Sequence, residues 1–187
     1  MAGVITAWEP SRTAPFTGMS PRAFGKLVTV LRREGANTVR KGRPWGLSLE
    51  ERELLVAAYW RTNLTMRQLA LLFGVPKSAA DRVTDHLGPM LGLQPRKRFA
   101  KDAVLIVDDT LVPTRDHTVA EQSKNYRYFT NHQQAHNKSH KQVRTRVEHT
   151  FARMKTWKIL RDCRLKGDGV HHAMRGIARL HNLALAG

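Results

Sequence analysis

The chain has 187 residues, of which 41% are hydrophobic, and this size suits one ordinary globular domain or two small ones. Its longest apolar run, Leu54 to Trp60, is far too short to cross a membrane, and its first residues lack the layout of a secretory signal, so we expect a cytoplasmic protein. The one cysteine, Cys163, excludes an internal disulfide bond and a zinc site built from several cysteines.

The charge of the chain predicts a polyanionic partner. Lysine and arginine number 32 against 15 acidic residues, a net charge of +17, and nucleic acid is the usual partner of so basic a protein. Residues 102–134 are the exception, with 3 basic and 5 acidic side chains. Such an acidic island could hold a divalent cation beside a phosphate backbone, although a solvated strand-and-loop region would have the same composition.

The first part of the chain is expected to hold one helix and a basic linker. The stretch up to Pro15 has no periodic pattern and is expected to be a loose arm. Ser20 followed by Pro21 predicts the start of a helix, apolar residues at helical spacing follow, and the helix should end near Gly35. The segment from Arg40 to Gly46 is rich in glycine, proline and arginine, and its charges either follow a DNA backbone or belong to a solvated hinge.

Three helices are predicted next. Two of them open with a capping box, in which a serine or threonine is followed three residues later by glutamate or glutamine: Ser48 with Glu51, and Thr65 with Gln68. Gly74 ends the second helix, Val75 and Pro76 turn the chain, and Lys77 to Leu87 form the third. Two short helices joined by a tight glycine turn and preceded by another helix predict a trihelical helix-turn-helix.

A helix-turn-helix inserts the second helix of the pair into the major groove, with its first residues nearest the base edges. The candidate contact residues are therefore Lys77, Ser78, Ala79, Asp81 and Arg82. Arg67, early in the preceding helix, is placed to meet a phosphate. The alternative is a plain three-helix bundle whose exposed charges bind nothing specific.

After the basic linker Gln94 to Lys101, the pattern changes from helical spacing to a continuous apolar run. This run, Ala103 to Val107, is rich in β-branched residues and predicts a buried strand. The strand ends in Asp108 and Asp109, which point to opposite faces, so at most one of them can join a given site. A weaker strand is expected over Tyr126 to His132.

The last third of the chain is predicted to be helical. One apolar stripe is formed by Val143, Val147, Phe151 and Met154. Arg144, Glu148 and Lys155 lie on its flank at spacings of four and seven, which by themselves indicate a surface ion-pair ladder. A final helix is expected from Val170 to Leu185, packed back on the strand.

Three segments together resemble bacterial insertion-sequence transposases of the DDE type: the helix-turn-helix TMRQLALLFGVPKSAADR, the strand LIVDDTLVPTRDH and the helix RTRVEHTFARMK. The resemblance covers nearly the whole chain. It implies a mainly α protein with a small β component, in which the helix-turn-helix is followed by a ribonuclease H-like α/β domain. In that family three acids hold two divalent metal ions: one acid ends the first strand, one lies on a later strand, and a glutamate lies on a C-terminal helix.

Residue by residue, the resemblance places the first acid on Asp108 and the third on Glu148, where they would bind Mg²⁺ or Mn²⁺. The spacing of Arg144, Glu148 and Lys155 matches the pattern around that glutamate, which implies that Arg144 and Lys155 contact DNA, with Lys155 near the cleavage point. Two metal ions held by carboxylates can activate a water molecule or a 3′ hydroxyl and stabilise the leaving oxygen.

The chain departs from the family between the first strand and the glutamate helix. Further strands and the second aspartate belong there, but only Thr114 to His140 intervenes and no matching acid is present, since Asp116 lies too near Asp108. We therefore interpret residues 102–187 as a truncated DDE domain, unable to cut DNA, with its seam near Asn131 to His136.

Three histidines near that seam recur every four residues: His132, His136 and His140. On a helix they would stack along one side and could bind zinc. The absence of an accompanying carboxylate and the strongly basic surroundings argue against such a site.

The predicted protein has an N-terminal helix and linker in residues 1–47, the helix-turn-helix in 48–93 and the truncated DDE domain in 102–187. It would bind double-stranded DNA at the terminal inverted repeats of its element, alone, as a homodimer or with a full-length transposase, in the bacterial nucleoid and not at a membrane. Two alternatives stay open: a repressor-like regulator that occupies the sites of a full-length transposase, and an active endonuclease whose missing aspartate comes from a partner chain.

Overall fold

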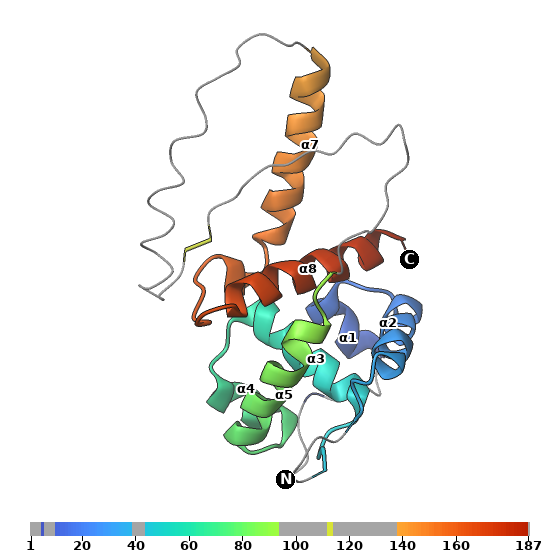
Figure 1. Cartoon of the computed structure of the whole chain (residues 1–187), viewed down its shortest axis with the longest axis vertical. Helices are drawn as coiled ribbons and strands as arrows, with labels where there is room; N and C mark the ends of the chain where they lie inside the picture. Colours follow the sequence, from blue (N-terminus) through green and yellow to red (C-terminus); the bar gives the residue numbers. More distant parts are fainter. Residues whose placement is uncertain (1–4, 6–9, 39–43, 94–111, 114–137, 187) are drawn as a thin grey trace.

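The structure is a computed structural model that describes residues 5, 10–38, 44–93, 112–113 and 138–186. In chain order the elements are α1 (Pro10–Thr17), α2 (Pro21–Arg33), α3 (Leu49–Thr62), α4 (Met66–Phe73), α5 (Lys77–Met90), α7 (Lys138–Met154), the 3₁₀ helix η2 (Lys158–Leu160) and α8 (Gly169–Ala186). The expected mainly α fold is confirmed (Figure 1). Over the described ranges, β structure is limited to one bridge residue, Cys163, whose N–H donates to the Pro113 carbonyl at 2.9 Å.

Helix α3 is the centre of the described fold. Its predicted capping box is present: Ser48 Oγ accepts from the Glu51 N–H at 3.2 Å, and the Glu51 carboxylate accepts from the Ser48 N–H at 2.9 Å. Every residue from 52 to 60 is buried, so this helix has no solvent face along its middle turns. The sequence pattern predicts burial on one side only, and the other sides are covered because α1, α5 and η2 all pack against α3.

Residues 10–15 belong to helix α1, and the expectation of a loose arm up to Pro15 is wrong there. Thr13 and Thr17 are buried, and the Thr17 hydroxyl donates to the Thr13 carbonyl at 2.8 Å. α1 packs against α3, and a short segment without an apolar stripe of its own can be helical when such tertiary packing supports it.

Helix α2 begins as predicted. Ser20 is its N-cap, with the Ser20 Oγ accepting from the Ala23 N–H at 3.2 Å, and Pro21 is the first helical residue. The helix ends at Arg33, and Gly35 follows with a φ of 84°. Val30 is exposed, whereas five of its other apolar residues are buried against the neighbouring helices: Ala23, Phe24, Leu27, Val28 and Leu31.

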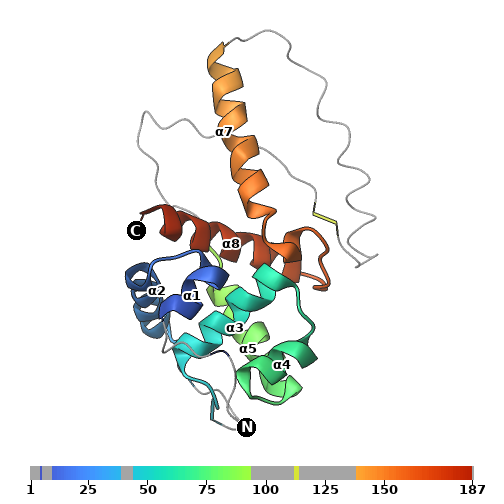
Figure 2. The same cartoon turned by 180° about the vertical axis from the view of Figure 1, so that it is seen from behind.

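The C-terminal helix α8 packs on the N-terminal helices, beside α5 and over the end of α3 (Figures 1 and 2). Gly176 makes this approach close, because a Cβ atom built there would lie 2.2 Å from the Trp60 ring. Arg175 Nε donates to the Leu93 carbonyl at 2.9 Å and Arg179 donates to the Met90 carbonyl at 3.1 Å, which ties α8 to the end of α5. The final predicted helix is confirmed, whereas the strand expected beneath it lies outside the described residues.

Helix α7 projects away from this helical body and meets it only at its C-terminal end (Figures 1 and 2). Val147 and Phe151, two residues of its predicted apolar stripe, are half-buried, and Met154 at the end of the helix is buried. None of the described helices is long and apolar enough to cross a membrane.

Candidate nucleic-acid interface

Helices α4 and α5 form the predicted pair. The Thr65 capping box opens α4, with the Gln68 Oε1 accepting from the Thr65 N–H at 2.9 Å. Gly74 ends α4 in the left-handed region with a φ of 66°, a conformation that glycine adopts without a steric penalty. Val75 and Pro76 then turn the chain into α5, which runs three residues past the predicted end at Leu87.

The first turn of α5 is open to solvent, while its inner face anchors the helix. Ala80, Val83 and Leu87 are buried, as the apolar pattern predicts. Lys77 and Ser78 are exposed, and Ala79 is half-buried. No side chain caps the start of this helix, and the amides of an uncapped helix start can bind a phosphate.

The candidate contact residues differ in their present partners. Lys77 Nζ forms an ion pair with the Asp81 carboxylate one turn later, so these two side chains neutralise each other. The Arg82 guanidinium is exposed but lies over the Trp45 ring, 4.5 Å from its centroid. Arg67 is exposed on the first turn of α4.

Trp45 is the residue of this site that the sequence pattern does not identify. Besides Arg82, two other residues contact its ring. The guanidinium carbon of Arg52 lies 4.6 Å from the ring centroid, and the centroid of the His86 ring lies 5.2 Å from it. The Arg82 guanidinium also donates to the Pro44 carbonyl at 3.5 Å. The only signal in the sequence is a tryptophan inside a basic segment. In the structure this ring is half-buried, unlike a residue of a solvated hinge. Residues 39–43 of the same segment lie outside the described ranges.

Arg52 is the buried member of this cluster. Its guanidinium donates to the Ala36 carbonyl at 3.0 Å, to the Ser48 carbonyl at 3.3 Å and to the Asn37 side chain. Burial lowers the pKa of Arg52 to about 10, opposed by Glu50 and reinforced by Arg82. Because its donors are occupied by the protein, Arg52 holds the Trp45 segment in place and leaves Arg82 as the outward cation.

The acids expected from the DDE pattern are not assembled by the described residues. Asp108, Asp109 and both predicted strands lie outside them, as do the side chains of Arg144 and His140. Glu148 is exposed on α7, and Lys155 is half-buried just past the end of that helix. Over the described ranges no three histidine, cysteine or acidic side chains gather into a possible metal site, so those residues do not by themselves fit a divalent ion and we derive no step through one.

Two protein families match parts of the chain. The family described as helix-turn-helix of DDE superfamily endonuclease matches residues 45–96, the range that holds Trp45, α3, α4 and α5. The family described as DDE superfamily endonuclease matches residues 81–182.

A curated relative is similar over the whole chain. It is a protein of Streptomyces albus G described as a transposase for insertion sequence element IS112, 62% identical over 256 aligned positions that cover 100% of both chains. No solved structure matches the chain.

Proposed function

Because this chain belongs to the insertion-sequence transposases that carry a helix-turn-helix and a DDE-superfamily endonuclease domain, we propose that it binds the ends of its element through α5 and does not cut DNA. In this proposal Lys77, Ser78, Ala79 and Arg82 contact the major groove, and Arg67 contacts a phosphate. The partner is double-stranded DNA at the terminal inverted repeats.

One observation carries the DNA-binding part of the proposal. Lys77 and Ser78 in the first turn of α5 are exposed, while α8 contacts the other end of the helix, where Arg179 donates to the Met90 carbonyl and Arg175 donates to the Leu93 carbonyl just beyond it. The C-terminal part of the described structure therefore packs on the end of α5 that is remote from the groove-facing residues. A helix-turn-helix reads DNA with the start of its second helix, and that end is the one left accessible.

Duplex binding tests this part. We expect the intact chain to bind a duplex carrying a terminal inverted repeat more tightly than a random duplex of the same length, with affinity falling steeply as salt increases. The variant Lys77→Ala/Arg82→Ala should lower the preference for the repeat. The matched control Arg22→Ala/Lys26→Ala removes two exposed cations from α2 and should keep that preference. Equal affinity of the intact chain for both duplexes would refute specific recognition.

The second part of the proposal is that the acidic trio is incomplete. No aspartate lies between Asp116 and Glu148, where the family pattern has its second one. The alignment with the Streptomyces relative has 256 positions, whereas this chain has 187 residues. Some residues of the relative must therefore align with gaps in this chain, which supports an internal deletion. We expect no magnesium-dependent nicking of element-end DNA. Nicking that disappears in both Asp108→Asn and Glu148→Gln would instead support an endonuclease completed by a second chain.

An intact DNA-binding module beside an incomplete trio also favours a second candidate function. Such a chain could occupy the element ends and exclude a full-length transposase, as a repressor does. Transposition of a marked element should then fall when this chain is co-expressed, and the Lys77→Ala/Arg82→Ala variant should relieve the inhibition. Unchanged transposition with the intact chain would exclude this role.

A further inference from the structure

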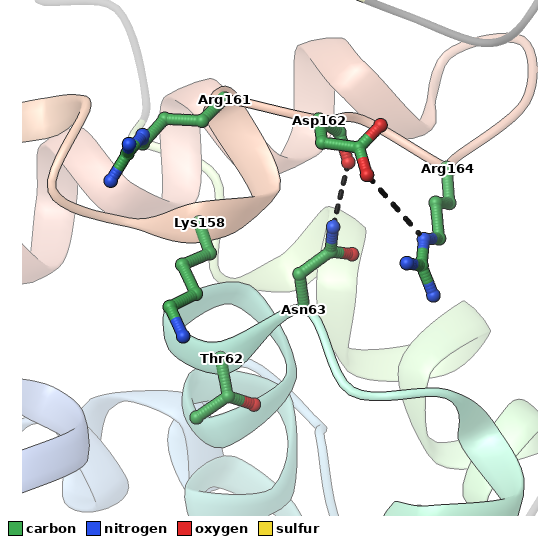
Figure 3. A pocket seen from close by; sticks show the side chains of 6 residues that line it. All are labelled: Thr62, Asn63, Lys158, Arg161, Asp162 and Arg164. Carbon is green, nitrogen blue, oxygen red and sulfur yellow. Dashed lines mark hydrogen bonds and ion pairs between the residues drawn. The ribbon is translucent and has the colours of Figure 1, made fainter.

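A basic pocket lies where the end of α3 meets the segment around η2. Its volume is about 420 Å³, and it is lined by Thr62, Asn63, Lys158, Arg161, Asp162 and Arg164 (Figure 3). The two walls are about a hundred residues apart in the chain, so the fold and not the local sequence brings them together. Neither the sequence pattern nor the family comparisons assign a role to this pocket.

The charges of the pocket favour an anion. Among the described residues three cations and one acid line it, and the carboxylate of that acid, Asp162, lies 3.8 Å from the Arg164 Nε. Lys158 and Arg161 are exposed and form no hydrogen bond or ion pair through their side chains with any described residue. Within the described part of the chain, two cationic side chains at this pocket therefore have no bonded partner.

The backbone beneath these cations is held in place. Asn63 ends α3 in the left-handed region with a φ of 52°, and its side-chain amide donates to the Asp162 carbonyl at 2.7 Å (Figure 3). One residue earlier, the Thr62 hydroxyl donates to the Ala58 carbonyl at 2.6 Å. The Arg61 guanidinium lies 4.8 Å from the centroid of the Trp157 ring and so joins the same two segments. Cations on a fixed backbone lose less conformational freedom when they bind a ligand.

The pocket also lies next to the helix-turn-helix. Thr62 and Asn63 lie three and two residues before Thr65, the capping residue of α4, and Arg67, the expected phosphate contact, lies on the first turn of that helix. Figures 1 and 2 agree that the segment around η2 lies on the same side of the molecule as α4. A duplex bound at the start of α5 would therefore extend its backbone along this side.

We propose that this pocket contacts the phosphate backbone of the DNA beside the segment read by α5, through Lys158, Arg161 and Arg164. The inference rests on the proposed function, and it adds a contact that positions the duplex without reading its sequence. Residues from the DDE part of the chain thereby contribute to the footprint of the helix-turn-helix.

Salt-dependent binding of the full chain to two duplexes, one with a terminal inverted repeat and one random, tests the proposal. The variant Lys158→Ala/Arg161→Ala should weaken binding to both duplexes by the same factor, because a phosphate contact carries no sequence information. The slope of log affinity against log salt should become shallower by about 0.9 for each phosphate that the variant no longer neutralises. The control Arg22→Ala/Lys26→Ala removes two exposed charges from α2, which does not line the pocket, and should keep the slope of the intact chain.

A second variant moves binding in the other direction. Asp162→Asn removes the acid that lines the pocket among the described residues, while the backbone carbonyl that accepts from Asn63 remains, so affinity for both duplexes should rise. The pocket contact would be overturned if Lys158→Ala/Arg161→Ala behaved like the α2 control, or if Asp162→Asn left the affinity unchanged. Neither result would contradict recognition by α5. Equal binding of the repeat and random duplexes by the intact chain would refute the proposed function. The change in the salt slope in Lys158→Ala/Arg161→Ala would still show whether the pocket contacts phosphate.

Discussion

Glu53 is a carboxyl group buried in the middle of α3. Its exposed fraction is 0%, and neither oxygen accepts a hydrogen bond from any residue that the structure describes. Burial raises the pKa of Glu53 well above its ordinary value of 4.5, while Arg179 opposes the rise and Glu50 adds to it. A buried carboxyl without a partner is more stable in the neutral form, so the proton stays on Glu53 at a pH where exposed glutamates are ionised.

This burial makes stability depend on pH. Above pH 4.5 the unfolded chain releases the proton, whereas the folded chain keeps it until the raised pKa is reached, so the contribution of Glu53 to the free energy of unfolding falls as pH rises between the two values. Glu53→Gln should remove this contribution. In urea unfolding from about pH 5 to pH 8, the free energy of unfolding of the variant should therefore increase relative to that of the parent chain as pH rises. A difference between the two proteins that stays constant over this range would contradict the prediction.

We expect Trp45 to affect DNA binding indirectly, by positioning the guanidinium of Arg82. Trp45→Leu should then weaken duplex binding by up to about thirtyfold, since a cation–π contact contributes roughly 0.5–2 kcal/mol. Arg82→Ala should also weaken binding, and adding Trp45→Leu to it should have little further effect. Affinities of the two single variants and the double variant form the test, with Trp45→Phe as a control that keeps an aromatic ring. Fully additive effects would show that Trp45 acts independently of Arg82.

The contact between α8 and α3 depends on one missing side chain. A Cβ atom at Gly176 would lie 2.2 Å from the buried ring of Trp60, which has no room to move away. Gly176→Ala should therefore destabilise the chain by about 1–3 kcal/mol, despite the better helix propensity of alanine. Gly25→Ala is the matched control, because a Cβ atom there meets nothing within 4 Å in the middle of α2. It should stabilise the chain by up to about 1 kcal/mol in the same urea unfolding measurement.

The elements that local chemistry determines are predictable from the sequence. The capping residues Ser20, Ser48 and Thr65 and the glycine turn at Gly74 all occur in the structure where the pattern places them. Each of these signals acts over three or four residues, so the residues that cause the structure are adjacent in the chain. The candidate residues at the start of α5 follow directly from that geometry.

The features that the sequence does not reveal depend on distant packing. Helix α1 has a proline at Pro15 and no apolar stripe, and it is supported by contact with α3. Trp45 joins the site because Arg52 and Arg82 lie over its ring. The pocket beside η2 lies between two segments that are distant in the chain and that the Asn63–Asp162 hydrogen bond and the Arg61–Trp157 contact join. None of these contacts has a sequence spacing that a periodic pattern could detect.

At the scale of the whole molecule, the helix-turn-helix and the C-terminal helix share one core. Trp60 of α3, Leu87 of α5 and Ile177 of α8 belong to the same cluster of buried residues. The two family matches also overlap at residues 81–96, a range that includes most of α5. The described part of the chain therefore does not divide into a DNA-binding unit and a catalytic unit with separate interiors.

This shared core predicts that the helix-turn-helix is less stable alone. A fragment of residues 1–93 would lack α8 and expose the ring of Trp60 that packs against Gly176, which should cost about 2–3 kcal/mol of unfolding free energy. The intact chain should lose its described helices in one transition, observed by circular dichroism, and the fragment should unfold at a lower urea concentration. Adding a separate peptide of residues 156–187 should raise the midpoint of the fragment, because the peptide restores the missing face. A fragment as stable as the intact chain, with no response to the peptide, would mean that α8 contributes nothing to the core around Trp60.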